Sequence, residues 1–411
     1  MNKIRIKNFG PIKEGYQEEG GWMDIKKVTV FIGNQGSGKS TVAKVVSTLI
    51  WMEKALNRGD IEEPKSFVDF HNYFKYQGIK DYFDLNTIIE FYGDAFNILY
   101  NSEGGKPYIL THKNSSTKYV VPKISYVPAE RNFLSVMKNA TGVRGLPEPL
   151  FDFAEELKIG QTEIQDKEIL LPINDLFYKY DKDSSSSFII GKDFRVNLLF
   201  ASSGFQSLVP LFLVSSTLAN RVASGTELNP YSINVTQSIR MNEQITKIML
   251  DVELSDSEKI ERAKEIQSKY LNKCFINVVE EPEQNLFPTS QWQMLQKLLE
   301  FNNLSEANKL ILTTHSPYII NYLSITIEAA SLRKKINPDN VNSLIKLYEI
   351  VPENSTANAN DVVVYQLEEK DGTIRKLPTF DGIPSDKNYL NMMIRKGNEQ
   401  FDSLLELEEE L

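Results

Sequence analysis

The stretch Gly33-Asn34-Gln35-Gly36-Ser37-Gly38-Lys39-Ser40-Thr41 matches the phosphate-loop pattern G-x-x-x-x-G-K-[ST]. It follows the β-branched run Val28–Ile32, which predicts a buried strand, and precedes apolar residues at helical spacing from Val42 to Ile50. Glycines let such a loop approach phosphates, which the N–H groups of the helix start then bind. We therefore predict that all nine residues bind nucleotide phosphates, with Lys39 on the β- and γ-phosphates and Ser40 on Mg²⁺.

Two adjacent carboxylates end a second apolar run. Cys274–Val279 predicts a buried strand, and Glu280 and Glu281 follow it directly. A strand beside a phosphate loop delivers an acidic group toward Mg²⁺, so we predict Glu280 on the metal side and Glu281 polarising the attacking water. Adjacent carboxylates are costly unless a cation lies nearby, which favours a metal site over the alternative, a solvated acidic loop.

A histidine follows a third apolar run. His315 comes after Leu310–Thr313, and we expect it to contact the γ-phosphate and sense its presence; the alternative is a structural histidine. Further strands are predicted near Ile4–Phe9, Leu344–Val351 and Val362–Leu367. Strands that alternate with helical stretches predict an α/β fold.

Composition narrows the class of protein. The 411 residues are 41% hydrophobic and 25% charged, which is globular composition, and Cys274 is the only cysteine, so an internal disulfide framework is excluded. The formal net charge of -9 disfavours a generally basic nucleic-acid binder. The N-terminus has no signal-peptide pattern and no apolar run approaches the roughly 20 residues of a spanning helix. We expect a cytoplasmic protein without membrane contact.

The order of the motifs carries a family resemblance. The phosphate loop is followed by Ser202-Ser203-Gly204-Phe205-Gln206, then Glu280–Glu281, then His315. This order resembles the Walker A, signature, Walker B and H-switch motifs of ABC-type ATPases. The spellings EEPEQNLFP and TTHSPYIINYL look like the soluble ABC ATPases of the overcoming-lysogenization-defect type. Relatives of these include the ATPase subunits of the Septu and PARIS anti-phage systems. The opening IRIKNFGPIK looks like the first strand of SMC-type and repair ATPases.

The resemblance implies an ABC-type P-loop ATPase with a mixed sheet core and a helical insert lobe, using ATP and Mg²⁺. It implies that Ser203 and Gly204 contact the γ-phosphate of ATP held by a second copy, so that the chain forms an ATP-sandwich homodimer or a higher oligomer. Glu281 would be the general base, His315 the switch, and Pro282–Pro288 the segment that crosses the dimer interface.

The sequence departs from that pattern in two places. Phe205 stands where many ABC proteins have glycine, which makes the backbone approach less free. No clear Q-loop glutamine is found, and Tyr126–Arg131 resembles the segment in that place, which leaves the second Mg²⁺ ligand open. For Arg131, two roles stay open: a phosphate or coupling residue, or a structural salt bridge.

The domain prediction is one ABC-type ATPase domain over 1–411. Helical or irregular insertions are expected at about 53–122 and 216–270, and 340–411 is expected to complete the domain with strands and a tail. Arg240–Tyr270 has helical spacing, and we interpret it as a platform for a partner or for a second copy; a lid on its own core is the alternative. No nuclease motif is recognisable.

The function predicted is an ATP-hydrolysing sensor or scaffold subunit of a bacterial anti-phage complex, which controls a separate nuclease or toxin effector. An SMC-like DNA-repair or DNA-clamping ATPase is the main alternative, and direct nucleic-acid contact stays open. The negative net charge and the lack of a long coiled coil count against the DNA-clamping alternative. A transporter ATPase subunit would need a membrane partner, and a P-loop small-molecule kinase explains neither Ser203–Gly204 nor His315.

Overall fold

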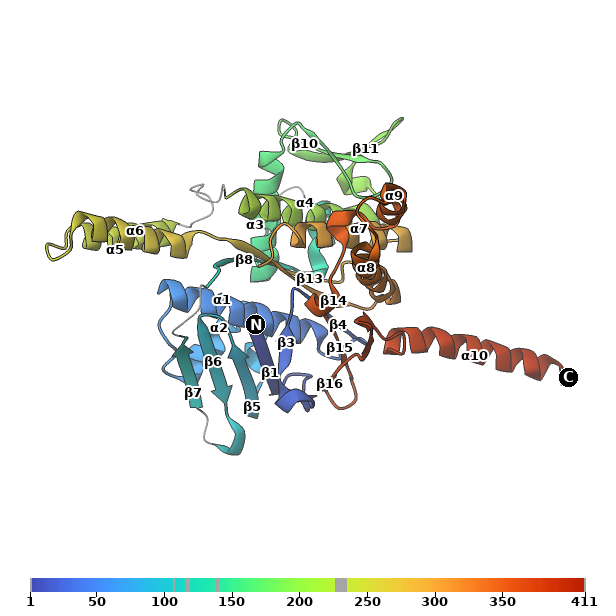
Figure 1. Cartoon of the computed structure of the whole chain (residues 1–411), viewed down its shortest axis with the longest axis horizontal. Helices are drawn as coiled ribbons and strands as arrows, with labels where there is room; N and C mark the ends of the chain where they lie inside the picture. The colour runs from blue at the N-terminus through green and yellow to red at the C-terminus, as the bar shows by residue number, and fades with distance from the viewer. Residues whose placement is uncertain (1, 106–107, 115–118, 138–139, 226–234, 410–411) are drawn as a thin grey trace.

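A seven-stranded, mostly parallel sheet forms the centre of the computed structural model, which describes residues 2–105, 108–114, 119–137, 140–225 and 235–409 (Figure 1). From edge to edge its strands are β2 (Gly15–Tyr16), β16 (Thr373–Lys376), β15 (Val362–Leu367), β4 (Val28–Gly33), β14 (Lys309–Thr314), β13 (Cys274–Glu280) and β8 (Pro122–Val127). Strands β15, β4, β14, β13 and β8 run parallel, whereas β16 pairs antiparallel with β15. The predicted α/β class with a mixed sheet is confirmed.

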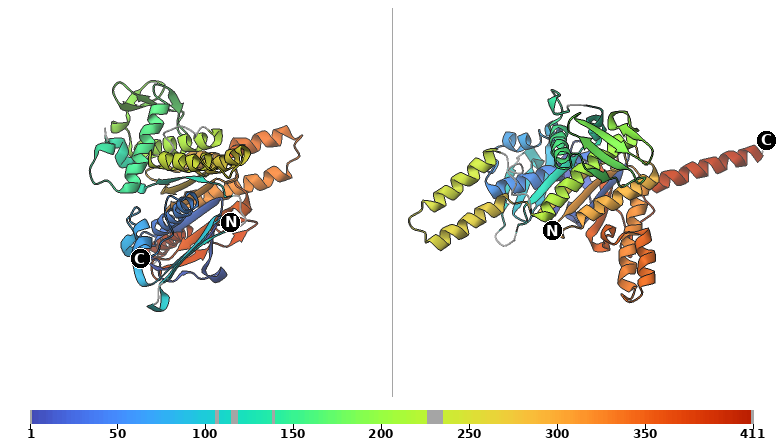
Figure 2. Two further views of the ribbon diagram at one scale, coloured as in Figure 1. Left: turned by 90° about the vertical axis from the view of Figure 1, so that its left-hand side faces the viewer. Right: turned by 90° about the horizontal axis from the view of Figure 1, so that it is seen from above.

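Both faces of the central sheet are covered, which explains why its strands are continuous apolar runs. Phe31 and Ile311 belong to a buried cluster with α1 (Lys39–Arg58). Their neighbours Val30 and Leu312 face the opposite way, toward a second cluster. That cluster includes three helices, α4 (Ser203–Ser224), α7 (Pro288–Asn302) and α8 (Pro317–Lys335) (Figures 1 and 2).

A second, antiparallel sheet packs against the other side of α1 (Figure 1). Its strands in order are β3 (Met23–Ile25), β1 (Asn2–Phe9), β5 (Phe83–Tyr92), β6 (Phe96–Asn101) and β7 (Tyr108–Lys113). The short helix α2 (Phe67–Tyr73) adds Phe70 to the same core. The strand expected at Ile4–Phe9 is therefore confirmed.

A smaller lobe packs on α4. It consists of α3 (Glu148–Glu163) and a four-stranded antiparallel sheet, β9 (Glu168–Leu170), β10 (Phe177–Asp181), β11 (Ser186–Ile190) and β12 (Arg195–Asn197). The strands β10 and β11 lie above α4 in Figure 1. Its buried residues, Phe153 and Tyr178 among them, join the core cluster of α4. The lobe therefore shares one core with the helix that carries Ser203 and Gly204.

Three helical projections leave the body (Figures 1 and 2). They are the hairpin of α5 (Val235–Met249) and α6 (Asp256–Tyr270), the pair of α8 with α9 (Val341–Ile350), and α10 (Tyr389–Glu409), which follows the two-stranded ribbon of β17 (Thr379–Phe380) and β18 (Ile383–Pro384). Within the described ranges, no helix is long and apolar enough to span a bilayer. The helical prediction for Arg240–Tyr270 is confirmed.

One predicted strand is wrong. Residues 344–351 lie mostly in helix α9, whose start is capped by the Asn340 side chain, which accepts from the Ser343 N–H. The apolar residues Leu347 and Val351 are four apart, as on one helix face, and pack with Ala329 of α8. Short apolar runs fit strand and helix periodicities alike, and here packing against α8 decides.

Candidate active site

The phosphate loop connects β4 to α1 at the carboxyl end of the central sheet. Gly33, Gly36 and Gly38 have positive φ angles of 151°, 77° and 97°. A Cβ at Gly33 would lie 2.5 Å from the Leu367 carbonyl oxygen, and one at Gly38 would lie 2.5 Å from Ile12 Cδ1. Side chains are thus excluded at both ends of the loop, while nothing lies within 4 Å of the Cβ position of Gly36. The loop is therefore closely packed at Gly33 and Gly38, and open at Gly36.

The start of α1 has the features of an anion site. Gly38 at its N-cap provides no side-chain hydrogen bond, and the first helical turn contains no acidic residue. The Ser37 hydroxyl is buried and has no hydrogen-bond partner among the described residues. Free N–H groups and a buried hydroxyl without a partner suit a bound phosphate. The geometry of the loop therefore fits the predicted ligand.

Lys39 is held inside the loop. Its Nζ donates hydrogen bonds to the carbonyl oxygens of Gly33, at 3.0 Å, and Asn34, at 2.8 Å. Burial lowers the pKa of Lys39 to about 8, although the negative charges of Glu281, Glu283 and Glu280 raise it. An anion beside this ammonium group would compensate the cost of its burial. The next two residues differ in exposure: Ser40 is exposed and Thr41 is buried.

Strand order brings the three sequence motifs together. Strand β14 lies between β4 and β13, with Thr314 beside Ile32 and Thr313 beside Glu280. The phosphate loop follows β4, His315 follows β14 and Glu281 follows β13. All three therefore lie at the carboxyl ends of neighbouring parallel strands. Open α/β sheets commonly bind their ligands just beyond the carboxyl ends of the strands, where these segments begin.

Glu280 and Glu281 have different surroundings. The Glu280 carboxylate is buried, accepts a hydrogen bond from the Tyr126 hydroxyl and lies 3.4 Å from the Ala129 N–H. The Glu281 side chain is 35% exposed, and its Oε1 lies 3.3 Å from Nε2 of His315. The hydrogen bond from His315 lowers the pKa of Glu281 although burial opposes it. Glu281 is therefore ionised at neutral pH and open to solvent.

Glu283 is a residue that the sequence reasoning missed. Its carboxylate accepts hydrogen bonds from the Thr314 hydroxyl at 2.8 Å and from the His315 N–H at 2.7 Å. Burial raises its pKa. Glu283 thus fixes the turn after β13 to the start of the His315 segment. The available signal was a third carboxylate two residues after Glu281, in the run EEPE.

Of the two roles considered for Arg131, a structural salt bridge is not found among the described residues, and the phosphate or coupling role stays a prediction. It is 1% exposed and donates to the carbonyl oxygens of Ser207 (3.2 Å), Glu280 (2.7 Å) and Glu281 (2.6 Å). Burial lowers its pKa to about 10. Arg131 therefore joins the end of β13 to α4 through backbone carbonyls, and no salt bridge involves it in the described part of the chain.

The signature-like residues lie at the start of α4. Ser203 is exposed, and the N-cap Ser202 makes no side-chain capping bond. A Cβ on Gly204 would lie 2.9 Å from the carbonyl oxygen of Asn285, and the Asn285 amide donates to the Ser207 hydroxyl at 3.1 Å. The start of α4 thus packs on the turn after Glu283, and none of the hydrogen bonds described here joins it to the phosphate loop of the same chain.

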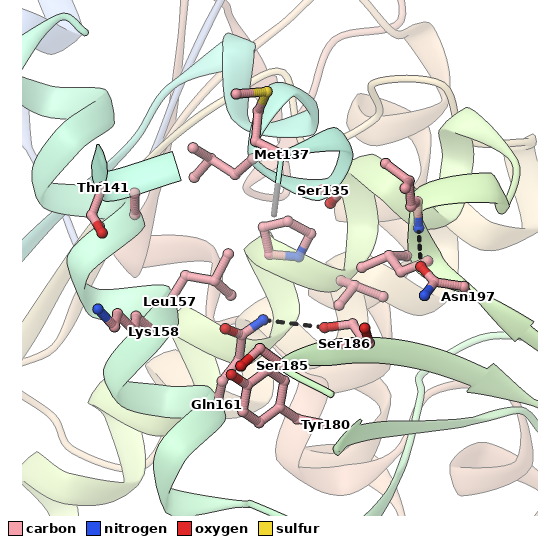
Figure 3. Close-up of a pocket in the computed structure, with 17 residues that line it drawn as sticks. Ser135, Met137, Thr141, Leu157, Lys158, Gln161, Tyr180, Ser185, Ser186 and Asn197 are labelled. Atoms are coloured by element: carbon pink, nitrogen blue, oxygen red, sulfur yellow. Dashed lines mark hydrogen bonds between the residues drawn. The ribbon is translucent and has the colours of Figure 1, made fainter. Parts of the chain in front are cut away.

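A separate cavity of about 470 Å³ lies between α3, the β10–β11 hairpin and α4 (Figure 3). Gln161, Tyr180 and Asn197 are among the residues that line it, together with Pro210 of α4. No residue of Gly33–Thr41 lines it. It is distinct from the candidate active site.

The residues present fit Mg²⁺ only together with a nucleotide. Among the described residues, no group of three or more His, Cys, Asp and Glu side chains could hold a metal ion. Mg²⁺ in nucleotide sites is commonly bound by one or two protein groups plus substrate phosphates. The Ser40 hydroxyl and the Glu280 carboxylate are oxygen donors of the kind that Mg²⁺ takes; Ser40 lies in the first turn of α1, and Glu280 ends β13.

Comparisons with known proteins give one partial family match. A family model described as an AAA ATPase domain matches residues 254–320, which include Glu280, Glu281 and His315. A search of curated proteins finds no match. The matched segment is less than a fifth of the 411 residues, so it identifies an ATPase-type segment and not the family of the chain.

Among solved structures, similar chains include an SMC head domain from Thermotoga maritima, at 10% identity and a TM-score of 0.38, which covers 92% of this chain and 98% of that one. A Pyrococcus furiosus Smc head domain with an extended coiled coil has 9% identity, a TM-score of 0.39 and coverage of 98% and 100%. A dimeric post-hydrolysis ATP-binding cassette has 13% identity, a TM-score of 0.28 and coverage of 92% and 100%. These scores are too low to decide family or function. The chain is therefore an α/β protein with a phosphate loop and an AAA ATPase domain match over 254–320.

Proposed function

We propose that the chain binds ATP with Mg²⁺ and hydrolyses it to ADP and phosphate. The observation that carries the proposal is the contact between Glu281 and His315, whose Oε1 and Nε2 atoms lie 3.3 Å apart. Both residues follow central strands at the same carboxyl end of the sheet at which the phosphate loop begins. A half-exposed, ionised carboxylate beside a phosphate site is suited to accept a proton from water. The partial ATPase-domain match includes both residues and supports the same reading.

Each site residue has a proposed role. Residues Gly33–Thr41 bind the phosphates, and the Lys39 ammonium group leaves its backbone acceptors for the β- and γ-phosphates. Ser40 and Glu280 hold Mg²⁺, which neutralises phosphate charge when bound. Glu281 is the general base, and His315 orients it and contacts the γ-phosphate.

Two copies are proposed to complete the site. Ser203 and Gly204 begin a helix without a capping side chain and without an acidic residue in the first turn, which leaves its N–H groups for an anion. In a head-to-tail dimer, this helix start would contact the γ-phosphate bound by the other copy, and Pro282–Pro288 would cross the interface. Within this segment, Phe287 is 73% exposed. An exposed aromatic residue suits a protein interface.

For the biological role, we propose a cytosolic sensor or scaffold ATPase of a bacterial anti-phage complex, which gates a separate nuclease or toxin. The motif spellings EEPEQNLFP and TTHSPYIINYL support this through their resemblance to such ATPase subunits. The α5–α6 hairpin is the proposed partner platform, because it projects from the body and exposes Leu250 (74%) and Val252 (94%) at its tip (Figure 1). Exposed apolar residues of this kind mark interaction sites.

The test is recovery of the tagged chain from its native locus in the presence of ATP, with partners identified by mass spectrometry. The proposal predicts a stoichiometric nuclease or toxin, lost when 237–268 is replaced by a short Gly/Ser linker. Recovery with DNA instead, together with DNA binding that weakens steeply as salt rises, would support a DNA-clamping ATPase and contradict the effector role.

A further inference from the structure

A second cavity, of about 490 Å³, lies between the phosphate-loop helix α1, the segment after α2, strand β8 and helix α3. This volume is in the usual range of small-molecule sites. Its wall combines aromatic rings and carboxylates, from Trp51, Tyr73, Tyr76, Tyr126, Glu148 and Asp152. No residue of the phosphate loop lines it, so the cavity is separate from the proposed ATP site.

The aromatic part of the wall is accessible. Trp51 is 42% exposed, and its ring centroid lies 5.9 Å from that of Tyr73 at an interplanar angle of 51°. At this separation the two rings pack against each other, so a ligand would contact their outer faces. The electron-rich faces of Trp and Tyr attract guanidinium and ammonium groups.

The acidic part of the wall comes from one helix face. Glu148 and Asp152 are four residues apart on α3, so their carboxylates are neighbours and repel each other. Both residues are exposed, and Asp152 accepts a hydrogen bond from the Tyr76 hydroxyl at 2.7 Å. The one basic residue on the wall, Lys75, is exposed. A cation in the cavity would relieve this repulsion.

The wall also contains a buried acceptor. Gln77 lines the same cavity and is 4% exposed, and its side-chain oxygen has no hydrogen-bond partner among the described residues. Buried acceptors without partners are rare and costly in folded proteins. This oxygen has almost no accessible surface, so a ligand N–H would reach it only after the wall rearranges.

We propose that this cavity binds an organic cation, a guanidinium or primary ammonium group on an aliphatic stem. The rings of Trp51 and Tyr73 contact the stem and the charge, and Asp152 neutralises the charge. Two sources share this chemistry: an arginine or lysine side chain of a partner protein, and a free alkyl amine. The carboxylates repel anionic ligands of the same shape, and a neutral ligand lacks the attraction that a cation gains.

The cavity also shares a residue with the candidate active site. Tyr126 lines it, and the hydroxyl of Tyr126 donates to the buried carboxylate of Glu280. A ligand in the cavity that contacts Tyr126 would therefore affect the hydrogen bond to Glu280, the proposed metal ligand. This consequence rests on the proposed ATPase function, whereas binding of the cation does not.

Binding is tested by titrating the full-length chain with butylguanidinium and with butylurea, its neutral counterpart of similar shape. Trp51 is one of three tryptophans, so tryptophan fluorescence reports occupancy, and Trp51→Phe identifies its share of the signal. We expect a saturable change with butylguanidinium only. Asp152→Asn keeps an acceptor for Tyr76 but removes the charge, and is expected to weaken binding roughly tenfold. Glu155→Gln, exposed on the same helix and outside the cavity, should bind as the parent does.

The source is distinguished with two further probes, agmatine and the capped peptide acetyl-Gly-Arg-Gly-amide. Tighter binding of the peptide assigns the site to a partner's side chain, and tighter binding of agmatine assigns it to a free amine. No saturable binding of any cation, or equal binding of butylurea, overturns the proposal. Isothermal titration calorimetry measures binding to the Trp51→Phe variant, which lacks the fluorescence signal of Trp51. An ATPase assay on the same samples shows separately whether the proposed ATPase function holds.

Discussion

Nε2 of His315 lies 3.3 Å from Oε1 of Glu281, although the two residues follow different strands, β14 and β13. The contact exists because these strands are parallel neighbours in register, with Glu280 beside Thr313. Glu283 stabilises the same arrangement, because its carboxylate accepts a hydrogen bond from the backbone N–H of His315. The candidate base, its histidine partner and their support thus form one hydrogen-bonded unit beside the phosphate loop.

Nucleotide binding should be linked to proton uptake at Lys39. The pKa of Lys39 is about 8 in the free chain, and bound phosphates will raise it. Between these two pKa values the complex holds one more proton than the free chain, so affinity falls as pH rises above about 8, by up to about tenfold per pH unit. Calorimetric titration with Mg-ATP in buffers of different ionisation enthalpy measures this uptake. Lys39→Ala should abolish binding, and pH-independent affinity between pH 7 and 9 would contradict the assignment.

Glu283 should position His315. Glu283→Ala removes the acceptor of the Thr314 hydroxyl and the His315 N–H, which should cost about 1–3 kcal/mol of unfolding free energy. ATP turnover should fall roughly 10- to 100-fold, because small displacements of reacting groups are costly. Glu283→Gln retains an acceptor and should lose less of both. Steady-state phosphate release and urea unfolding check this, and equal turnover of the parent and the alanine variant would contradict it.

Arg131 should act as a structural clamp. Arg131→Met leaves the carbonyl oxygens of Glu280 and Glu281 without their buried donor, so we expect a loss of about 3 kcal/mol in unfolding free energy. Arg395→Met, at an exposed position of α10, serves as the matched control and should change stability by less than about 0.5 kcal/mol. Urea midpoints compare the two. If both variants unfold at the same midpoint, the clamp is unimportant.

Glu53 should make stability depend on pH. Burial raises its pKa from 4.5 to about 7, although its Oε1 accepts the N–H groups of Ala95 and Phe96. The fold therefore disfavours the ionised carboxylate, and this contribution to stability is lost as pH rises from 4.5 through 7, up to about 3 kcal/mol. Glu53→Gln keeps the acceptor without the charge. Its stability should equal the parent's near pH 4.5 and exceed it at pH 8, whereas parallel urea-unfolding profiles across this range would contradict the shift.

Much of the fold could be predicted because its strands are buried on both faces. Val28–Ile32, Cys274–Val279 and Leu310–Thr313 are continuous apolar runs, and each is a strand of the central sheet. The strand predicted at Leu344–Val351 failed because that run packs on one face only, against α8. Periodicity in a short run does not separate these cases.

The site was harder to predict, because its details depend on which strands are neighbours. Motif spacing indicated Lys39, Glu281 and His315, but sequence does not reveal that β14 lies between β4 and β13. The contacts that follow from strand order, from Tyr126 to Glu280 and from Arg131 to backbone carbonyls, were therefore missed. Side chains that bind backbone atoms across the fold leave no spacing pattern.

The most direct test of the account is single-turnover hydrolysis by Glu281→Gln, measured beside equilibrium ATP binding. The amide keeps the shape of the side chain but does not accept a proton from water, so we predict ATP affinity within about threefold of the parent and hydrolysis slower by 10²-fold or more, as an order of magnitude. Hydrolysis at the parental rate would contradict the central claim, because Glu281 would then not be the base.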